Sequence, residues 1–314
     1  MHLRFSAVPS LMKKLIALLV AALLLIEPAT AWNKPGHMVM GAMIYQLLKG
    51  SDPEALIKLV ALLKQHPQYE SLWLPQIKQF TQSQEEAEQY LLMLAARWPD
   101  DARGSEYSHS DWHYVNFPFK PAYNKGTTPV SIGGNLIEAY EENVAILKGN
   151  AAESEKAVAL CWVLHLAGDI HQPLHSSTYI AEKFPQGDRG GNLFFVKART
   201  EDKGVNLHSF WDGLITGTPR YRETLNIATE LRNRSDFKRA ALRELGISNI
   251  KGWALESFAV AREKTYLNGQ LEGGTSKEEA ALLPAGYPKA SKAIAERQLV
   301  LASYRMSDLL ASLY

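Results

Sequence analysis

Apolar residues recur every three to four positions along most of the chain, which is the spacing of one face of an α-helix. Start signals such as Asp52-Pro53 and stop signals such as Pro173 bound several of these stretches. The pattern predicts helices over residues 36–49, 53–65, 82–96, 135–147, 153–170, 236–245, 249–266 and 288–313. It contains no fixed-period repeat and no low-complexity linker, so we expect one domain.

One stretch has the pattern of a strand. Residues 193–197, Leu-Phe-Phe-Val-Lys, follow a glycine-containing loop at 188–192 and predict a short strand, with 205–207 as a candidate hairpin partner. The sequence therefore predicts an all-α fold, a single helical domain with at most one small β-hairpin.

The first 31 residues have a different composition. Lys13 and Lys14 precede an unbroken apolar run at 15–26, and Ala29-Thr30-Ala31 has the small-x-small pattern of a signal-peptidase site. A helix of that run would rise about 18 Å, too short to cross a bilayer comfortably. We expect 1–31 to be a cleaved signal peptide and 32–314 to be the exported domain, secreted or periplasmic and not held at a membrane. A retained anchor is the alternative.

Charge and cysteine content narrow the candidate chemistry. The 314 residues carry a formal charge of +1 with 46% apolar and 21% charged residues, which are globular proportions. This balance argues against broad capture of nucleic acid by a basic surface, so any phosphate affinity must be local. Cys161 is the only cysteine. An internal disulfide and a thiolate zinc site are therefore excluded, and histidine and carboxylate remain as possible metal ligands.

Two histidine–aspartate pairs share a helical spacing of four. His165 and Asp169 lie in a strongly apolar helix, and His208 and Asp212 repeat the interval. This spacing puts both side chains on one helix face, about 6 Å apart, which suits two ligands of one metal. A buried histidine beside a buried carboxylate needs partners for both, and a divalent cation supplies them. Core hydrogen bonding would explain the spacing alone equally well.

Several motifs in order resemble the S-one/P-one single-strand nucleases, a family of trinuclear zinc enzymes. The blocks that carry the resemblance are Trp32 with His37, Trp98-Pro-Asp100-Asp-Ala-Arg103, Trp112-His113-Tyr114-Val115-Asn116, His165 through His175 with Gln172-Pro173-Leu174, Asp188 through Asn192, Asn206 through Asp212, and Trp253 through Ser257. They span the whole predicted mature chain. The resemblance implies a helical phospholipase C/nuclease-like fold.

The resemblance also implies a ligand set for three zinc ions. Asp100, His113, His165 and Asp169 would hold one ion. Asp169 would bridge to a second ion, completed by His37 and by the α-amine and carbonyl of Trp32. The third ion would be held by His175, His208 and Asp212. A free amine exists at Trp32 only after cleavage at Ala31, so export and activation would be one event.

The implied activity is hydrolysis of single-stranded DNA and RNA to 5′-phosphorylated products, together with 3′-nucleotidase activity. Asp169 and Arg103 would be catalytic, with Arg103 also binding the phosphate. Tyr114 would stack on an unpaired base, next to Asn116. Asn116 stands where the characterised eukaryotic members have aspartate. We expect a monomer without a stable protein partner.

The closest rival is a zinc-dependent phospholipase C, which shares the fold and a similar ligand order. In that family the first histidine lies farther from the N-terminal tryptophan, and the last ligand is glutamate. Here the interval from Trp32 to His37 is five and the last residue is Asp212. A secreted binding module with purely structural zinc is a third reading. A shared aspartate and open coordination positions argue against it.

Overall fold

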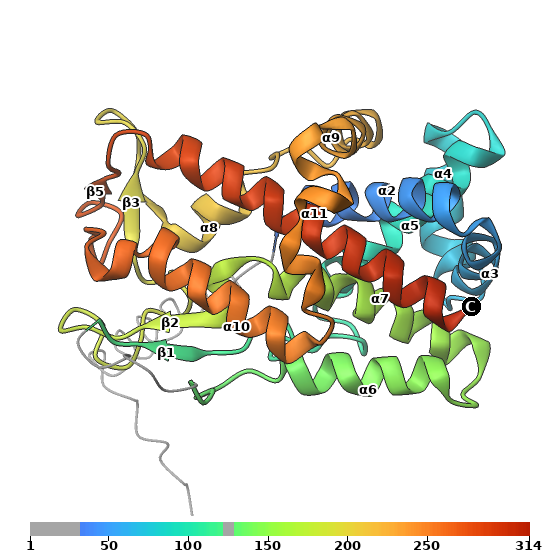
Figure 1. Ribbon diagram of the computed structural model, residues 1–314, viewed down its shortest axis with the longest axis horizontal. Helices are drawn as coiled ribbons and strands as arrows, with labels where there is room; N and C mark the ends of the chain where they lie inside the picture. The colour runs from blue at the N-terminus through green and yellow to red at the C-terminus, as the bar shows by residue number, and fades with distance from the viewer. Residues whose placement is uncertain (1–31, 122–128) are drawn as a thin grey trace, which may run out of the picture.

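The computed structural model describes residues 32–121 and 129–314, and the predicted signal peptide lies outside the described residues. Helices dominate this part of the chain, which confirms the predicted all-α class (Figure 1). Within the described residues, no helix combines the length and the apolar character needed to cross a membrane.

The α-helices account for most of the described chain. They are α2 (Lys34–Ser51), α3 (Pro53–Leu63), α4 (Leu74–Phe80), α5 (Gln84–Asp101), α6 (Leu136–Lys148), α7 (Glu153–Ile170), α8 (Leu207–Asp212), α9 (Tyr221–Asn233), α10 (Ile250–Val260) and α11 (Tyr287–Leu313). Two π-helical turns flank α4 and α10, at η1 (Tyr69–Trp73) and η6 (Ala261–Thr265). The 3₁₀ turns are η2 (Pro173–Ser176), η3 (Ser235–Phe237), η4 (Arg239–Ala241), η5 (Arg243–Gly246) and η7 (Leu267–Gly269).

Five short strands form two small sheets. They are β1 (Phe117–Phe119), β2 (Ser177–Tyr179), β3 (Phe195–Lys197), β4 (Val205–Asn206) and β5 (Ala281–Leu282). The predicted hairpin is present as the antiparallel pair β3–β4. In addition, β5 pairs with β3 in parallel, and β1 pairs with β2 in parallel. Pairings between segments this far apart leave no local pattern in the sequence.

Side-chain caps fix where several helices begin. Asn33 accepts a hydrogen bond from the Gly36 amide at the start of α2, and Asp52 does the same for Ala55 in α3. Ser83 caps α5 through Glu86. Each cap satisfies one amide that has no partner inside its helix. The bounds of α2, α3 and α5 thus follow from local residue chemistry.

Helices α2 and α7 form the centre of the molecule. Helix α2 packs against α5, α9 and α11, and α7 packs against α5, α6 and α11. Figure 1 shows the long helix α11 running past α7 towards the C-terminus. From Leu160 to Ile170 every residue of α7 is buried. Polar residues in this stretch are therefore withdrawn from water and must find partners inside the protein.

The predicted helix over 236–245 is wrong. The segment forms the successive 3₁₀ turns η3, η4 and η5 instead. Its buried apolar anchors Phe237 and Leu242 lie five residues apart, which is about 140° around an α-helix. A single α-helix could not bury both side chains on one face. The helices α4, α8 and α9 were not predicted, and α9 buries only small or polar residues between Tyr221 and Leu231.

Candidate metal centre

Helix α7 places His165 and Asp169 one turn apart in the core, both fully buried. The Nδ1 atom of His165 lies 3.0 Å from the Ala96 carbonyl oxygen of α5, to which it donates its proton. This fixes the tautomer and leaves Nε2 with a lone pair. That Nε2 lies 3.4 Å from Asp169 Oδ2.

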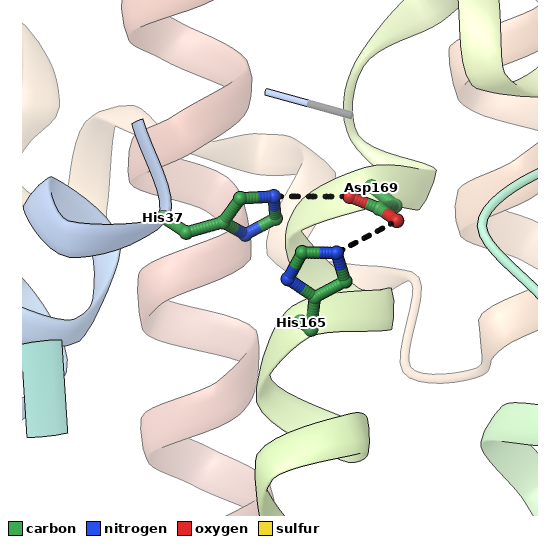
Figure 2. Close-up of side chains that lie close together, drawn as sticks. All are labelled: His37, His165 and Asp169. Atoms are coloured by element: carbon green, nitrogen blue, oxygen red, sulfur yellow. Dashed lines mark ion pairs between the residues drawn. The ribbon is translucent and has the colours of Figure 1, made fainter. Parts of the chain in front are cut away.

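His37 approaches Asp169 from helix α2. Figure 2 shows its ring beside His165, with Nε2 3.1 Å from Asp169 Oδ1. The rings of His37 and His165 stack with centroids 3.9 Å apart. Gly168 makes room for this approach, because a Cβ there would lie 2.8 Å from His37 Nδ1. Two distant helices therefore meet at one carboxylate.

The second oxygen of Asp169 faces His113. His113 Nδ1 lies 3.0 Å from Asp169 Oδ2 and 3.0 Å from His165 Nε2. Asp169 thus directs Oδ1 to His37 and Oδ2 to His113 and His165. A carboxylate with nitrogens on both sides has the arrangement of a ligand shared by two cations.

Asp100, at the end of α5, completes this side of the cluster. Its Oδ1 lies 4.0 Å from His165 Nε2 and accepts hydrogen bonds from Arg103 Nε at 3.1 Å and Nη2 at 2.7 Å. Asp100 Oδ2 is buried and has no hydrogen-bond partner. The Arg103 side chain is 24% exposed, so its guanidinium lies between the buried Asp100 carboxylate and solvent.

A second cluster forms where η2 meets α8. His175 Nε2 and His208 Nε2 lie 3.1 Å apart, and His208 Nε2 is 3.5 Å from Asp212 Oδ2. His175 Nδ1 donates to the His113 carbonyl oxygen, and His208 Nδ1 donates to the Gly190 carbonyl oxygen at 2.7 Å. Both Nε2 lone pairs are therefore directed towards each other and towards Asp212.

The buried donors and acceptors of these clusters are poorly satisfied by the protein alone. His37 Nδ1 and Nε2 and Asp169 Oδ1 are buried without a hydrogen-bond partner, although Nε2 and Oδ1 face each other. Each such group costs about 1–3 kcal/mol if it stays unpaired. Three groups of buried residues have ligand atoms within 4.8 Å of one another and could each hold a metal ion. They are His37, His165 and Asp169; Asp100, His113 and His165; and His175, His208 and Asp212.

The electrostatics of the site favour neutral imidazoles. Burial lowers the pKa of His37, His113 and His175 well below the usual value, and it lowers the pKa of His165 to about 3. Neutral imidazole is the form that binds metal. Burial, reinforced by Asp100, raises the pKa of Asp169 well above its usual range. A nearby cation would reverse that shift. The nitrogen and oxygen atoms of this site fit zinc and related metals.

The predicted substrate residues lie beside the first cluster. Tyr114 directly follows His113 and Asn116 lies three residues after it, and both are half-buried. The backbone N–H of Asn116 donates to the Gly133 carbonyl oxygen at 2.7 Å, and the backbone carbonyl oxygen of Asn116 accepts from the Ile132 N–H at 2.9 Å. Their roles towards a base, like the role of Arg103 towards a phosphate, stay predictions.

Trp32 is completely buried at the entrance to α2. A Cβ on Gly36, the residue before His37, would lie 3.0 Å from the Trp32 Cβ. The first described residue is thus packed against the turn that carries His37. Metal binding by its amine and carbonyl stays a prediction.

Sequence reasoning missed the groups that orient the predicted ligands. Gln172 is buried, and its Nε2 donates to Asp212 Oδ1 at 2.7 Å. The only available signal was its position in the Gln172-Pro173-Leu174 motif. The carbonyls of Ala96 and Gly190, which orient His165 and His208, had no signal because every residue has a carbonyl.

A groove of about 470 Å³ lies elsewhere, between Lys64 just after α3, the turn η1, α4 and the first turns of α5. Lys64, Tyr69 and Leu91 are among its lining residues, and none of the predicted site residues lines it. The chemistry of the described residues therefore gathers at the histidine–aspartate clusters and not in this groove.

Comparison with known proteins adds an independent line of evidence. A family model described as S1/P1 Nuclease matches residues 32–314. Endonuclease 2 of Arabidopsis thaliana is 28% identical over 207 residues, which cover 58% of this chain and 66% of that protein. Nuclease S1 of Aspergillus oryzae is 29% identical over 127 residues, or 38% of this chain and 40% of that protein. Endonuclease 4 of Arabidopsis thaliana is 38% identical over 80 residues, or 26% and 22%. The matched region spans less than two thirds of each relative's own length.

Proposed function

Because the chain belongs to the S1/P1 nuclease family, we propose that it is a metal-dependent hydrolase that cleaves single-stranded DNA and RNA. Its products would carry 5′-phosphates, and 3′-mononucleotides would also be substrates. The observation that carries this proposal is the convergence of His37, His113 and His165 on the two oxygens of Asp169. A similarly buried cluster of His175, His208 and Asp212 adjoins it, since His175 Nδ1 donates to the His113 carbonyl oxygen.

Three zinc ions would be held by the clustered residues. Asp169 would be shared between the group that contains His37 and the group that contains His113. When bound, zinc supplies Lewis acidity, which polarises phosphoryl oxygens and lowers the pKa of water from ~16 towards ~7. The donor set supports this assignment, because it holds only imidazole and carboxylate and keeps the imidazoles neutral.

The residues around the clusters would bind and orient the substrate. Arg103 is held by Asp100 and reaches solvent, so its planar guanidinium can present N–H groups to a phosphate. Tyr114 would stack on a base with Asn116 at the edge of that base. Only an unpaired base exposes its face, so stacking gives single-strand preference without a basic groove. The side-chain amide of Asn116 both donates and accepts, unlike an aspartate carboxylate.

The mature protein would begin at Trp32. The family match starts at residue 32, and the Trp32 side chain is buried beside the start of α2. We propose that removal of 1–31 during export frees an amine that binds the ion next to His37. The protein would then act outside the cytoplasm, as a monomer. A zinc-dependent phospholipase C is not favoured, since the matching family is that of the nucleases.

Metal analysis and a substrate panel test the proposal together. Protein purified from the secreted or periplasmic fraction is assayed against single-stranded DNA, duplex DNA, RNA and phosphatidylcholine, before and after treatment with a chelator. We expect cleavage of the single-stranded polymers that stops on chelation and returns with added zinc. Cleavage that continues after the metal has been fully removed would refute the proposal, and so would cleavage of phosphatidylcholine alone.

A further inference from the structure

The loop between β2 and β3 contacts the second cluster through its backbone. The Gly190 carbonyl oxygen accepts the Nδ1 proton of His208 at 2.7 Å. The next carbonyl, that of Gly191, accepts the His208 amide at 3.3 Å. His208 is thus held at its ring and at its main chain by two consecutive peptide groups.

The conformation of this loop requires glycine at both positions. Gly190 has φ +62° and Gly191 has φ +83°, in the left-handed region that side chains disfavour. A Cβ on Gly190 would lie 2.4 Å from the Leu174 carbonyl oxygen, and one on Gly191 would lie 3.1 Å from the His208 amide nitrogen. The backbone can therefore approach both histidine-bearing segments closely only without side chains.

Asp188 lies on the N–H side of the peptide group that joins Gly190 to Gly191. Its fully buried carboxylate accepts hydrogen bonds from the Tyr179 amide at 2.8 Å and from the Tyr266 hydroxyl at 2.7 Å. The Gly191 amide also acts on this carboxylate and helps to lower the pKa of Asp188. The single peptide that joins Gly190 to Gly191 thus offers its N–H to Asp188 and its C=O to His208.

No described lysine, arginine or histidine forms an ion pair with Asp188, and its charge is stabilised by the Tyr266 hydroxyl and by the backbone amides of Tyr179, Gly191 and Asp188 itself. Burial raises the pKa of Asp188 to about 6, while those donors oppose the rise. A buried carboxylate without a cation is costly. Both Asp188 oxygens accept a hydrogen bond, and an asparagine would place an NH₂ group where one of them stands, so the donors around Asp188 fit a carboxylate and not an amide.

We propose that Asp188 is a positioning residue that polarises the Gly190–Gly191 peptide and thereby holds His208 as the Nδ1–H tautomer, with Nε2 directed to the metal. Carboxylates commonly play this part by direct contact with a metal-bound histidine. In this protein the Gly190–Gly191 peptide group lies between the Asp188 carboxylate and the His208 imidazole. The inference rests on the proposed metal centre of His175, His208 and Asp212.

Two near-isosteric variants separate polarisation from simple bracing. Asp188→Asn removes the charge and leaves one acceptor oxygen, which can still face the Tyr179 amide while the NH₂ group turns to the Tyr266 hydroxyl. Tyr266→Phe removes the bond from Tyr266 and keeps the charge. Zinc affinity is measured on the full exported protein by competition with a chelator of known affinity. The His208 Nδ1–H signal is followed by NMR after labelling the histidines with ¹⁵N. Asp52→Asn, at the cap of α3, serves as the control for an aspartate-to-asparagine change.

In Asp188→Asn we expect one zinc ion to bind about 10- to 100-fold more weakly, with the His208 Nδ1–H signal shifted upfield. Tyr266→Phe is expected to lower the Tm and to leave both readouts near wild type. Unchanged zinc affinity and an unchanged Nδ1–H signal in a folded Asp188→Asn would overturn the inference. So would equal losses of zinc affinity in both variants, because bracing alone would then explain them. A wild-type protein that binds no zinc would instead refute the proposed metal centre itself.

Discussion

The substitution Asp169→Asn would remove the negative charge that lies between His37 on one side and His113 on the other. Asp169 presents Oδ1 to His37 Nε2 at 3.1 Å and Oδ2 to His113 Nδ1 at 3.0 Å. An asparagine side chain has one oxygen and one NH₂ group in place of the two oxygens. Whichever way the amide turns, one side of the cluster faces N–H bonds instead of a lone pair.

The size of the effect follows from the number of ligands lost. Zinc bound by four protein ligands contributes about 10–16 kcal/mol of binding free energy, or about 2.5–4 kcal/mol for each ligand. At about 1.4 kcal/mol per factor of ten, each of the two ions beside Asp169 should bind about 10²- to 10³-fold more weakly. The amide dipole that opposes one ion adds to this loss. We therefore expect at least two of three zinc ions to be absent from the purified Asp169→Asn protein, and activity to be abolished.

Elemental analysis of desalted protein measures this directly, with circular dichroism to check that the variant is folded. Asp101→Asn is the matched control, because Asp101 lies next to Asp100 but pairs with Lys34 at 2.7 Å and Arg97 at 2.8 Å. The control should retain all of its zinc. Retention of three zinc ions by Asp169→Asn would refute the shared carboxylate.

Three further predictions test the packing, the substrate contact and the electrostatics. Gly168→Ala places a methyl group 2.8 Å from His37 Nδ1. We expect the free energy of unfolding to fall by about 1–3 kcal/mol and the zinc content to decrease. A variant with the zinc content and the Tm of the wild type would contradict this prediction. Tyr114→Ala should reduce kcat/KM on single-stranded DNA about 10- to 100-fold and leave the zinc content unchanged, while Tyr114→Phe should retain activity. Equal kcat/KM values for the wild type and both variants would exclude stacking. In the metal-stripped protein, burial lowers the pKa of His37, His113 and His175 well below the usual value and that of His165 to about 3. Below pH 6.5 the unfolded state therefore binds more protons, and the free energy of unfolding should fall by about 1 kcal/mol for each of these four histidines between pH 7.5 and 5.5. The raised pKa values of Asp100 and Asp188, each about 6, and of Asp169 act in the opposite direction but involve three carboxyl groups against four histidines. Denaturant titrations that show greater stability at pH 5.5 would contradict the prediction.

Local patterns predicted the parts of the fold that depend on neighbouring residues. The caps at Asp52 and the stop at Pro173 lie where helices begin and end, and the spacing of His165 and Asp169 put both side chains on one face of α7. The spacing of His208 and Asp212 was informative even though helix α8 itself was not predicted. Periodicity of this kind reports a helix face regardless of what packs against it.

Contacts between distant segments could not be derived in the same way. His37 meets Asp169 only because α2 packs near α7, and this pairing was expected from the family resemblance and not from spacing. The segment 236–245 failed as a helix because its tertiary anchors Phe237 and Leu242 decide its path. The Gly190 carbonyl that holds His208 is invisible in sequence for the same reason: its effect depends on where the backbone passes, and not on a side chain.

The most direct test is an anomalous difference map at the zinc edge from crystals of the exported protein. The account predicts three peaks, two on opposite sides of the Asp169 carboxylate and one among His175, His208 and Asp212. A map of the folded protein without peaks at those positions, with its histidines bonded only to protein groups, would contradict it.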